Sequence, residues 1–182
     1  ARPELASMYW SVDEGIGQVL DRLDTLNLRD NTLVFLLSDN GGAAANQSDN
    51  APLKGFKGSK FEGGHRTPFV MSWLGTIEAG SSFDGLISAM DVYPTAAAAA
   101  GVSSTIGKPL DGINLLPYLL GDFSGDPQEV LFWSRSVEGG ARAGDFKLVG
   151  HEAHGWRLYN LEEDISETKD LSQENTELVE QL

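Results

Sequence analysis

Two apolar runs separated by a long glycine-rich segment most constrain how this chain can fold. The first run is Thr32–Leu37 and the second is Phe69–Trp73, and residues 38–68 between them show little periodicity. A run that is apolar throughout is typical of a central parallel strand covered on both faces. Because a long irregular loop in a compact domain is usually functional or disordered, we expect two strands joined by a candidate ligand site.

The beginning of this loop carries oxygen ligands. Asp39 and Asn40 directly follow the first apolar run and are followed by Gly41 and Gly42. Ligand sites of open α/β sheets lie beyond the carboxyl ends of the strands, and adjacent carboxylate and carboxamide oxygens suit Ca²⁺ or Mg²⁺. Asn-Gly is also a common turn sequence, so the residues alone leave a metal site and a plain turn both open.

The end of the loop carries lysines and a second glycine pair. Lys57 lies between Gly55 and Gly58, and an ammonium group there could hold an anionic substrate oxygen. Lys54 and Lys60 are alternatives, and all three could equally be solvated. The charged residues Glu62 and Arg66 lie close to the second apolar run, where we expect an ion pair.

Composition excludes several classes of function. The 182 residues carry a net charge of −14, which argues against nucleic acid as a partner because phosphate backbones require clusters of Lys and Arg. There is no cysteine, so disulfides, Cys-zinc sites and a cysteine nucleophile are excluded from this chain. No apolar run is long enough to span a bilayer. His65, His151 and His154 show no metal-ligand spacing.

The remaining pattern predicts an α/β fold in two parts. Residues 4–26 read as an amphipathic helix, and Ala96–Ala100 read as part of a short buried helix that Asp91 caps. The pattern predicts an α/β unit over residues 1–125, as part of a doubly wound sheet, and an antiparallel α+β subdomain over 126–182. Its strands are expected at 129–133, 140–143, 146–150 and 156–161, before a C-terminal helix at 174–182.

In this order and spacing, the motifs resemble the C-terminal part of the sulfatase family, within the alkaline-phosphatase-like superfamily. The resemblance rests on Ser38-Asp39-Asn40-Gly41, on the segment from Leu53 to Pro68, on Asp91-Val92-Tyr93-Pro94-Thr95, and on Trp156–Leu161 together with Glu163, Asp164 and Glu167. It implies that Asp39 and Asn40 are calcium ligands and that Lys57, five residues before Glu62-Gly63-Gly64, contacts the sulfate group of the substrate.

The family's other active-site parts are absent from this sequence. Its nucleophile is a formylglycine made within a Cys/Ser-x-Pro-x-Arg motif, and no such motif occurs here. The family's first pair of metal-binding aspartates and its catalytic histidine are also absent. The resemblance therefore implies a fragment that binds calcium weakly or not at all and does not turn over a sulfate ester of a sugar, an aryl group or another alcohol by itself.

Two alternatives stay open. The first is a phosphomonoester, phosphodiester or phosphonate hydrolase of the same superfamily, and the second is a structural or interaction domain without catalysis. The resemblance suggests a periplasmic, extracellular or lysosomal location. Because the apolar strand at Thr32–Leu37 and the leucine-rich first helix could be left uncovered, we also expect self-association, which light scattering from a clean monomer would contradict.

Overall fold

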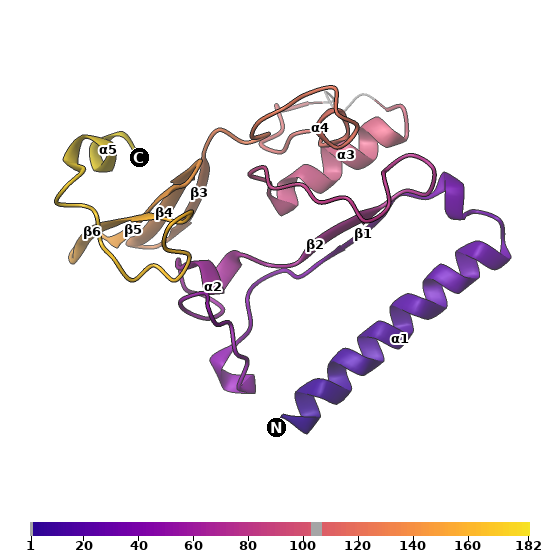
Figure 1. Ribbon diagram of the computed structural model, residues 1–182, viewed down its shortest axis with the longest axis horizontal. Coiled ribbons are helices and arrows are strands. Elements are labelled where there is room, and N and C mark those ends of the chain that lie inside the picture. The colour runs from indigo at the N-terminus through magenta and orange to yellow at the C-terminus, as the bar shows by residue number, and fades with distance from the viewer. Residues whose placement is uncertain (1, 103–106) are drawn as a thin grey trace.

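The computed structural model describes residues 2–102 and 107–182. In this part of the chain, a long helix is followed by a two-stranded hairpin, a group of short helices and a four-stranded sheet with a last helix (Figure 1). The two sheets share no strand, so the chain is organised around two separate β-structures.

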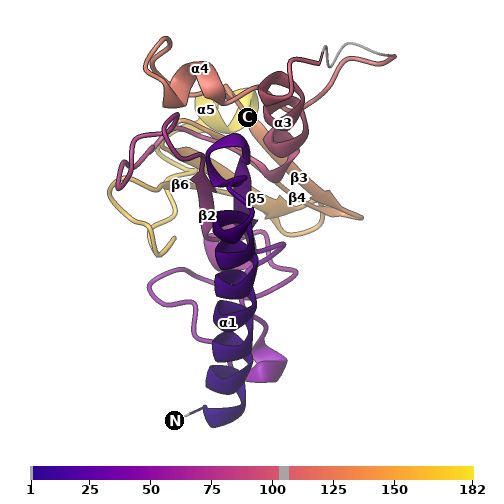
Figure 2. The same ribbon diagram turned by 90° about the vertical axis from the view of Figure 1, so that its right-hand side faces the viewer.

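The first helix, α1, spans Pro3–Thr25, as its apolar periodicity predicts. It runs as a long rod along one side of the molecule (Figures 1 and 2), and its N-terminal end lies near the long loop, where Arg2 Nη2 is 3.4 Å from Asp49 Oδ2. None of its residues is buried, and Met8, Tyr9 and Trp10 are each more than 60% exposed: 64%, 65% and 69%. Within the described residues, no helix combines the length and apolarity needed to cross a bilayer. Self-association through this uncovered surface stays a prediction.

The two apolar runs form a hairpin rather than part of a parallel sheet. Strands β1 (Val34–Leu37) and β2 (Phe69–Ser72) pair antiparallel, with Phe35 opposite Met71. The expectation of a parallel strand covered on both faces is therefore wrong for the described residues, in which β1 is only half-buried and Leu36 is 43% exposed. Parallel neighbours need a crossover that returns the chain to the same end of the sheet, whereas residues 38–68 bring β2 back beside β1 in the opposite direction.

Two short turns of helix interrupt this connection. They are the 3₁₀ turn η2 (Ala44–Asn46) and the one-turn helix α2 (Glu62–His65), and another 3₁₀ turn, η1 (Arg29–Asn31), precedes β1. A parallel doubly wound core is not seen in the described residues, in which both sheets are antiparallel.

The middle of the chain holds η3 (Ala89–Asp91), α3 (Val92–Ala99) and α4 (Leu116–Leu119). The prediction that the alanines pack into a buried helix is wrong, since only Pro94 and Thr95 of α3 are buried. Asp91 precedes α3 as expected, but its side chain does not cap that helix. Its carboxylate is fully buried and accepts hydrogen bonds from the backbone of Ser88 and Ile113 and from Gln128 Nε2. Asp91 thus joins three segments.

The C-terminal sheet confirms the predicted antiparallel strands. Its strands, in spatial and chain order, are β3 (Leu131–Arg135), β4 (Glu138–Ala143), β5 (Phe146–His151) and β6 (Gly155–Asn160), followed by helix α5 (Thr176–Gln181). Successive side chains of β5 and β6 point alternately to the two faces of this sheet. Val149 and Tyr159 form a buried cluster with Leu161, against which Phe61 of the long loop packs. The loop that follows β1 therefore rests on this sheet, while the boundary near residue 125 stays a prediction.

Candidate functional site

Asp39 and Asn40 lie where β1 ends. The Asn40 amide Nδ2 donates to Asp39 Oδ1 over 2.9 Å, and Ser38 Oγ donates to the Asn40 carbonyl over 2.9 Å. These local hydrogen bonds hold the two side chains together at the mouth of the loop. The Asp39 side chain is exposed, so its carboxylate is accessible to a ligand.

Lys57 lies beside this turn. Its backbone N–H donates to the Gly42 carbonyl over 3.0 Å, which brings the two halves of the long loop together. The Lys57 side chain is exposed and makes no hydrogen bond or ion pair with any described residue. Lys54 is engaged instead, because its Nζ donates to the Glu167 carbonyl over 2.9 Å. Of the two, Lys57 is therefore the one whose ammonium is available to a ligand.

Asn50 connects these segments, and the sequence reasoning did not identify it. Its Nδ2 lies 3.0 Å from the carbonyl oxygens of Gly42, Gly55 and Gly63, and its Oδ1 accepts from the Gly42 N–H over 3.1 Å. A single carboxamide thus joins three segments: the turn after β1, the lysine loop (residues 54–61, which carry Lys57), and the Glu-Gly-Gly turn (residues 62–64). Asn and Asp are common in loops for many reasons, so the sequence offers no signal that distinguishes this one.

Glycine is required where these backbones meet. A Cβ atom at Gly41 would overlap the carbonyl of Gly63, and a Cβ at Gly64 would overlap the backbone of Ser59. The Gly41 N–H also donates to the Gly64 carbonyl over 2.9 Å. The glycine pairs at the two ends of the loop thus allow direct backbone contact, which a side chain would prevent.

The donor set at this junction fits a hard cation only in part. Asp39 and Asn40 offer a carboxylate and a carboxamide oxygen, as calcium prefers, but two side chains fill only a fraction of its six to eight positions. Nowhere in residues 2–102 and 107–182 do three or more His, Asp or Glu side chains come together in a way that could hold a metal. The residues present are compatible with calcium as two ligands of an incomplete shell.

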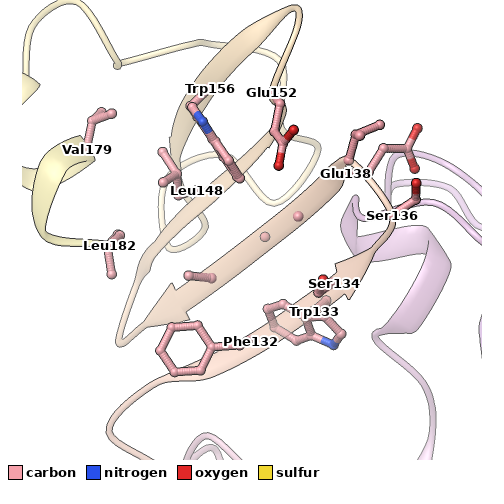
Figure 3. Close-up of a pocket in the computed structure, with 14 residues that line it drawn as sticks. Phe132, Trp133, Ser134, Ser136, Glu138, Leu148, Glu152, Trp156, Val179 and Leu182 are labelled. Atoms are coloured by element: carbon pink, nitrogen blue, oxygen red, sulfur yellow. The ribbon is translucent and has the colours of Figure 1, made fainter.

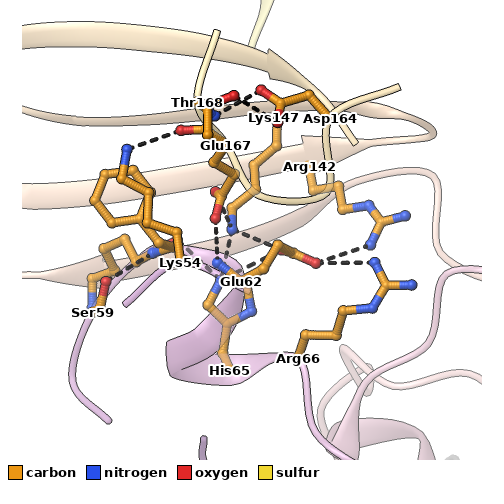
Figure 4. A network of polar contacts seen from close by, with 12 residues as sticks. Lys54, Ser59, Glu62, His65, Arg66, Arg142, Lys147, Asp164, Glu167 and Thr168 are labelled. Carbon is orange, nitrogen blue, oxygen red and sulfur yellow. Dashed lines mark hydrogen bonds and ion pairs between the residues drawn. The ribbon is translucent and has the colours of Figure 1, made fainter. Parts of the chain in front are cut away.

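A buried charge cluster lies behind the lysine loop (Figure 4). At its centre is Glu62, the first residue of α2, whose side chain is 1% exposed. Its Oε1 accepts from Lys147 Nζ over 2.7 Å, while its Oε2 lies 3.2 Å from Arg66 Nη1 and 3.8 Å from Arg142 Nη1. The expected Glu62–Arg66 ion pair is present, but the shortest contact comes from Lys147, in the C-terminal sheet.

Glu167 closes the cluster from the C-terminal segment. Its Oε1 lies 3.0 Å from Lys147 Nζ, and its Oε2 accepts from the Glu62 N–H over 2.7 Å. Burial by itself would raise the pKa of Glu62, but the charge and hydrogen bond of Lys147 hold that pKa below its usual value. Burial raises the pKa of Glu167, and Lys147 offsets only part of this effect. His65 and Arg142 also lower the pKa of Glu62, whereas the charge of Glu62 raises the pKa of Glu167.

His65 completes the cluster as a neutral imidazole. Its Nε2 lies 3.1 Å from Lys147 Nζ and 3.0 Å from the Lys60 carbonyl, and its ring stacks on Trp133 with centroids 4.1 Å apart. Burial, followed by the positive charge of Lys147, lowers the pKa of His65 to about 4. The sequence predicted no role for His65 or Lys147 in such a cluster, and the family resemblance gave Glu167 only as a structural marker. The sequence feature from which a buried ion pair could have been predicted is the lysine within the apolar run of β5.

Two cavities flank the sheet. One, of about 530 Å³, is lined by Asp39 together with His65, Arg66, Trp133 and Arg142, so the turn after β1 and the charge cluster share a solvent-filled space. The other, of about 380 Å³, lies on the opposite face between Phe132, Trp156 and helix α5 (Figure 3). None of the predicted site residues lines this second cavity.

Comparison with known proteins identifies the family. The sulfatase family model matches residues 5–102, which is more than half of the chain. An uncharacterized sulfatase from Escherichia coli, YdeN, is 41% identical over 132 residues, covering 72% of this chain and 23% of the relative. Human N-acetylgalactosamine-6-sulfatase is 35% identical over 153 residues, covering 82% of this chain and 28% of the relative.

Solved structures agree with this match. The crystal structure of Ps i-CgsB in complex with k-i-k-neocarrahexaose superposes with a TM-score of 0.87 at 36% identity, covering 96% of this chain and 40% of that one. The chain spans about a quarter of the length of the curated relatives it matches. On the family model and on these identities, the chain belongs to the sulfatase family.

Proposed function

We propose that this chain contributes to the active site of a sulfuric ester hydrolase, with Asp39 and Asn40 as calcium ligands and Lys57 as the residue that contacts the sulfate group. The observation that supports this proposal is the hydrogen bond between Lys57 N and Gly42 O, 3.0 Å long, which joins the lysine loop to the turn after β1. Asn50 strengthens this junction through Gly42 and Gly63.

The chemistry follows from where charge must be stabilised. Cleavage of a sulfate ester breaks the bond between sulfur and the alcohol oxygen, and negative charge develops on that oxygen. The exposed Lys57 ammonium would donate hydrogen bonds to the sulfate and to the leaving oxygen, which favours the transition state. When bound, calcium would neutralise charge on the sulfate oxygens, and a formylglycine hydrate would supply the attacking oxygen.

No residue of this chain can serve as that nucleophile. The sequence has no cysteine and no Ser-x-Pro-x-Arg motif, so the proposal assigns the attack on sulfur to a group outside these 182 residues. The isolated chain is therefore expected to be inactive. Sulfatase turnover by the isolated chain would contradict this part of the proposal and would require a different nucleophile.

The relatives favour a sulfate ester over a phosphate ester and a saccharide over other alcohols. Human N-acetylgalactosamine-6-sulfatase and the i-CgsB complex with a neocarrahexaose both carry a saccharide in their names, and both are at least 35% identical to this chain. Steryl-sulfatase is a relative at 36% identity in its human form, so we propose a sulfated saccharide as the substrate class and a sterol sulfate as its competitor.

Kinetics of the sulfatase polypeptide that carries this chain test the proposal. With 4-nitrophenyl sulfate as the substrate, Lys57→Ala should lower kcat/KM by about 10²–10³-fold, the usual loss when one donor to a developing oxyanion is removed. Lys169→Ala, at an exposed position of the C-terminal segment, is the matched control and should leave kcat/KM unchanged. Equal rates for both variants, or faster turnover of 4-nitrophenyl phosphate by the wild type, would refute the proposal.

A further inference from the structure

The segment that carries Lys57 is held at both ends by the C-terminal part of the chain. At its beginning, Lys54 Nζ donates to the Glu167 carbonyl over 2.9 Å and lies 4.2 Å from the centre of the Phe61 ring. At its end, the Glu62 N–H donates to Glu167 Oε2 over 2.7 Å. Lys57 lies between these two anchors. The position of the lysine loop is therefore set by residues more than 100 positions further along the sequence.

Lys147 of β5 contacts both Glu62 and Glu167, the residues that form these anchors. Its side chain is 0% exposed, and its ammonium lies within 3.1 Å of Glu62 Oε1, Glu167 Oε1 and His65 Nε2. The contact with Glu62 Oε1 is a hydrogen bond and that with Glu167 Oε1 is an ion pair, while His65 Nε2 accepts from Lys147 only in the tautomer that carries its proton on Nδ1. Because a buried charge is tolerated only when it is paired, Glu62 and Glu167 are held at fixed positions around Lys147.

We propose that Lys147 is a positioning residue for sulfate ester hydrolysis. Through Glu62 and Glu167, it fixes the loop that presents Lys57 to the sulfate group, although Lys147 itself lies in the interior and touches no substrate. This inference rests on the proposed function of Lys57. It explains why the C-terminal sheet, which holds none of the predicted substrate contacts, is packed against the Glu-Gly-Gly turn.

The ordinary explanation is that Lys147 only stabilises the fold. In that case its replacement would lower activity independently of Lys57, and the losses would multiply. If Lys147 acts through Lys57, then removing Lys57 should make the enzyme insensitive to Lys147, because the effects of residues that act as one unit are not additive. A double-mutant cycle on kcat/KM therefore separates the two explanations.

The cycle uses Lys147→Met, which keeps a chain of similar length and removes the charge. In the sulfatase polypeptide, Lys147→Met should lower kcat/KM for 4-nitrophenyl sulfate by about 10²-fold, as a displacement of about 1 Å at a reacting group does. In the Lys57→Ala background, the same change should cost about 3-fold or less. Lys169→Met, at an exposed position, is the control and should have no effect in either background. Multiplicative losses would overturn the inference.

A second variant guards against a general loss of folding. Lys147→Met leaves two buried carboxylates facing each other, whereas Lys147→Met/Glu167→Gln removes one positive and one negative charge together. The double variant should recover the wild-type resistance to unfolding but not its kcat/KM. Recovery of full kcat/KM would show that Lys147 is not needed to position the loop and would overturn the inference.

Hydrogen exchange separates this inference from the proposed function. The amides of Ser59, Gly63 and Gly64 donate to backbone carbonyls within the lysine loop and at its two ends. Their exchange should become at least about 10-fold faster in Lys147→Met and stay unchanged in Lys169→Met. If Lys57→Ala leaves turnover unchanged, the proposed function fails, yet faster exchange would still show that Lys147 positions the loop. Unchanged exchange would overturn the positioning role itself.

Discussion

The neutral, buried state of His65 predicts that the protein loses stability as the pH falls through the range between about 6.5 and 4. The pKa of His65 is lowered to about 4 in the folded protein, from 6.5 for an exposed histidine. Below pH 6.5 the unfolded chain binds a proton that the folded chain does not. The contribution of neutral His65 to the unfolding free energy is therefore fully present above pH 6.5 and is lost as the pH falls towards 4.

The magnitude follows from the difference between the two pKa values. A pKa difference of 1 corresponds to about 1.4 kcal/mol, so a lowering from 6.5 to about 4 corresponds to about 3 kcal/mol of unfolding free energy. The side chain is only 17% exposed, so solvent screening does not remove this contribution. Against a typical total of about 5–15 kcal/mol, a loss of this size is readily measured.

The two neighbouring carboxylates change the stability of the protein in opposite directions as the pH falls. The pKa of Glu167 is raised by burial, so its contribution to stability grows as the pH falls through that raised value towards 4.5, and it opposes the loss from His65. The pKa of Glu62 is lowered, so its contribution is lost only below about pH 4.5. Because both carboxylates remain when His65 is replaced, comparison with a His65 variant cancels most of their effect.

Urea unfolding monitored by tryptophan fluorescence from pH 7.5 to 4.5 provides the assay. The wild type should lose most of about 3 kcal/mol more than His65→Gln over this range, since glutamine can still accept from Lys147 but does not titrate. His154→Gln, at an exposed position in the turn between β5 and β6, is the matched control and should follow the wild type. Parallel curves for wild type and His65→Gln would refute the reasoning.

Two further predictions concern the junction of the loop. Gly41→Ala should lower the unfolding free energy by about 2 kcal/mol or more in thermal or urea denaturation, because its Cβ would overlap the Gly63 carbonyl, whereas Gly17→Ala, in the open interior of α1, should raise it by up to about 1 kcal/mol. Equal effects of the two changes would argue against close contact at Gly41. Asn50→Ala should cost about 2–3 kcal/mol by the same measurement, since its carboxamide serves Gly42 and Gly63, while Asn46→Ala, at an exposed position, should cost less than about 1 kcal/mol. A cost for Asn50→Ala no larger than for Asn46→Ala would contradict its role at the junction.

Much of the local structure could be predicted from the sequence. Helix α1 and strands β3 to β6 lie close to their expected positions, because each depends on a periodicity that neighbouring residues carry. Within the described residues β1 pairs antiparallel with β2, which the apolar run could not decide because such a run is compatible with a parallel or an antiparallel neighbour. The alanines of α3 were assigned to a buried helix, yet alanine is found in exposed helices as readily because it favours helix formation anywhere.

The candidate site divides in the same way. The order of motifs along the chain was sufficient to select Asp39, Asn40 and Lys57, and their roles stay predictions. The sequence did not indicate that Asn50 would join the loop to itself, or that Lys147 and Glu167 would hold its far end. These contacts join residues that are distant along the chain, so no local pattern encodes them.

The sequence by itself determined which chemical groups this protein possesses: hard oxygen ligands after an apolar strand, a lysine in a glycine-rich loop, and no cysteine. Only the tertiary structure decided which of the charged groups are available to a ligand. Lys57 is exposed, whereas Lys147 is buried between Glu62 and Glu167. The physical reason is that burial and pairing depend on how the C-terminal sheet packs against the loop, and this packing sets both the solvation of each charge and its partners.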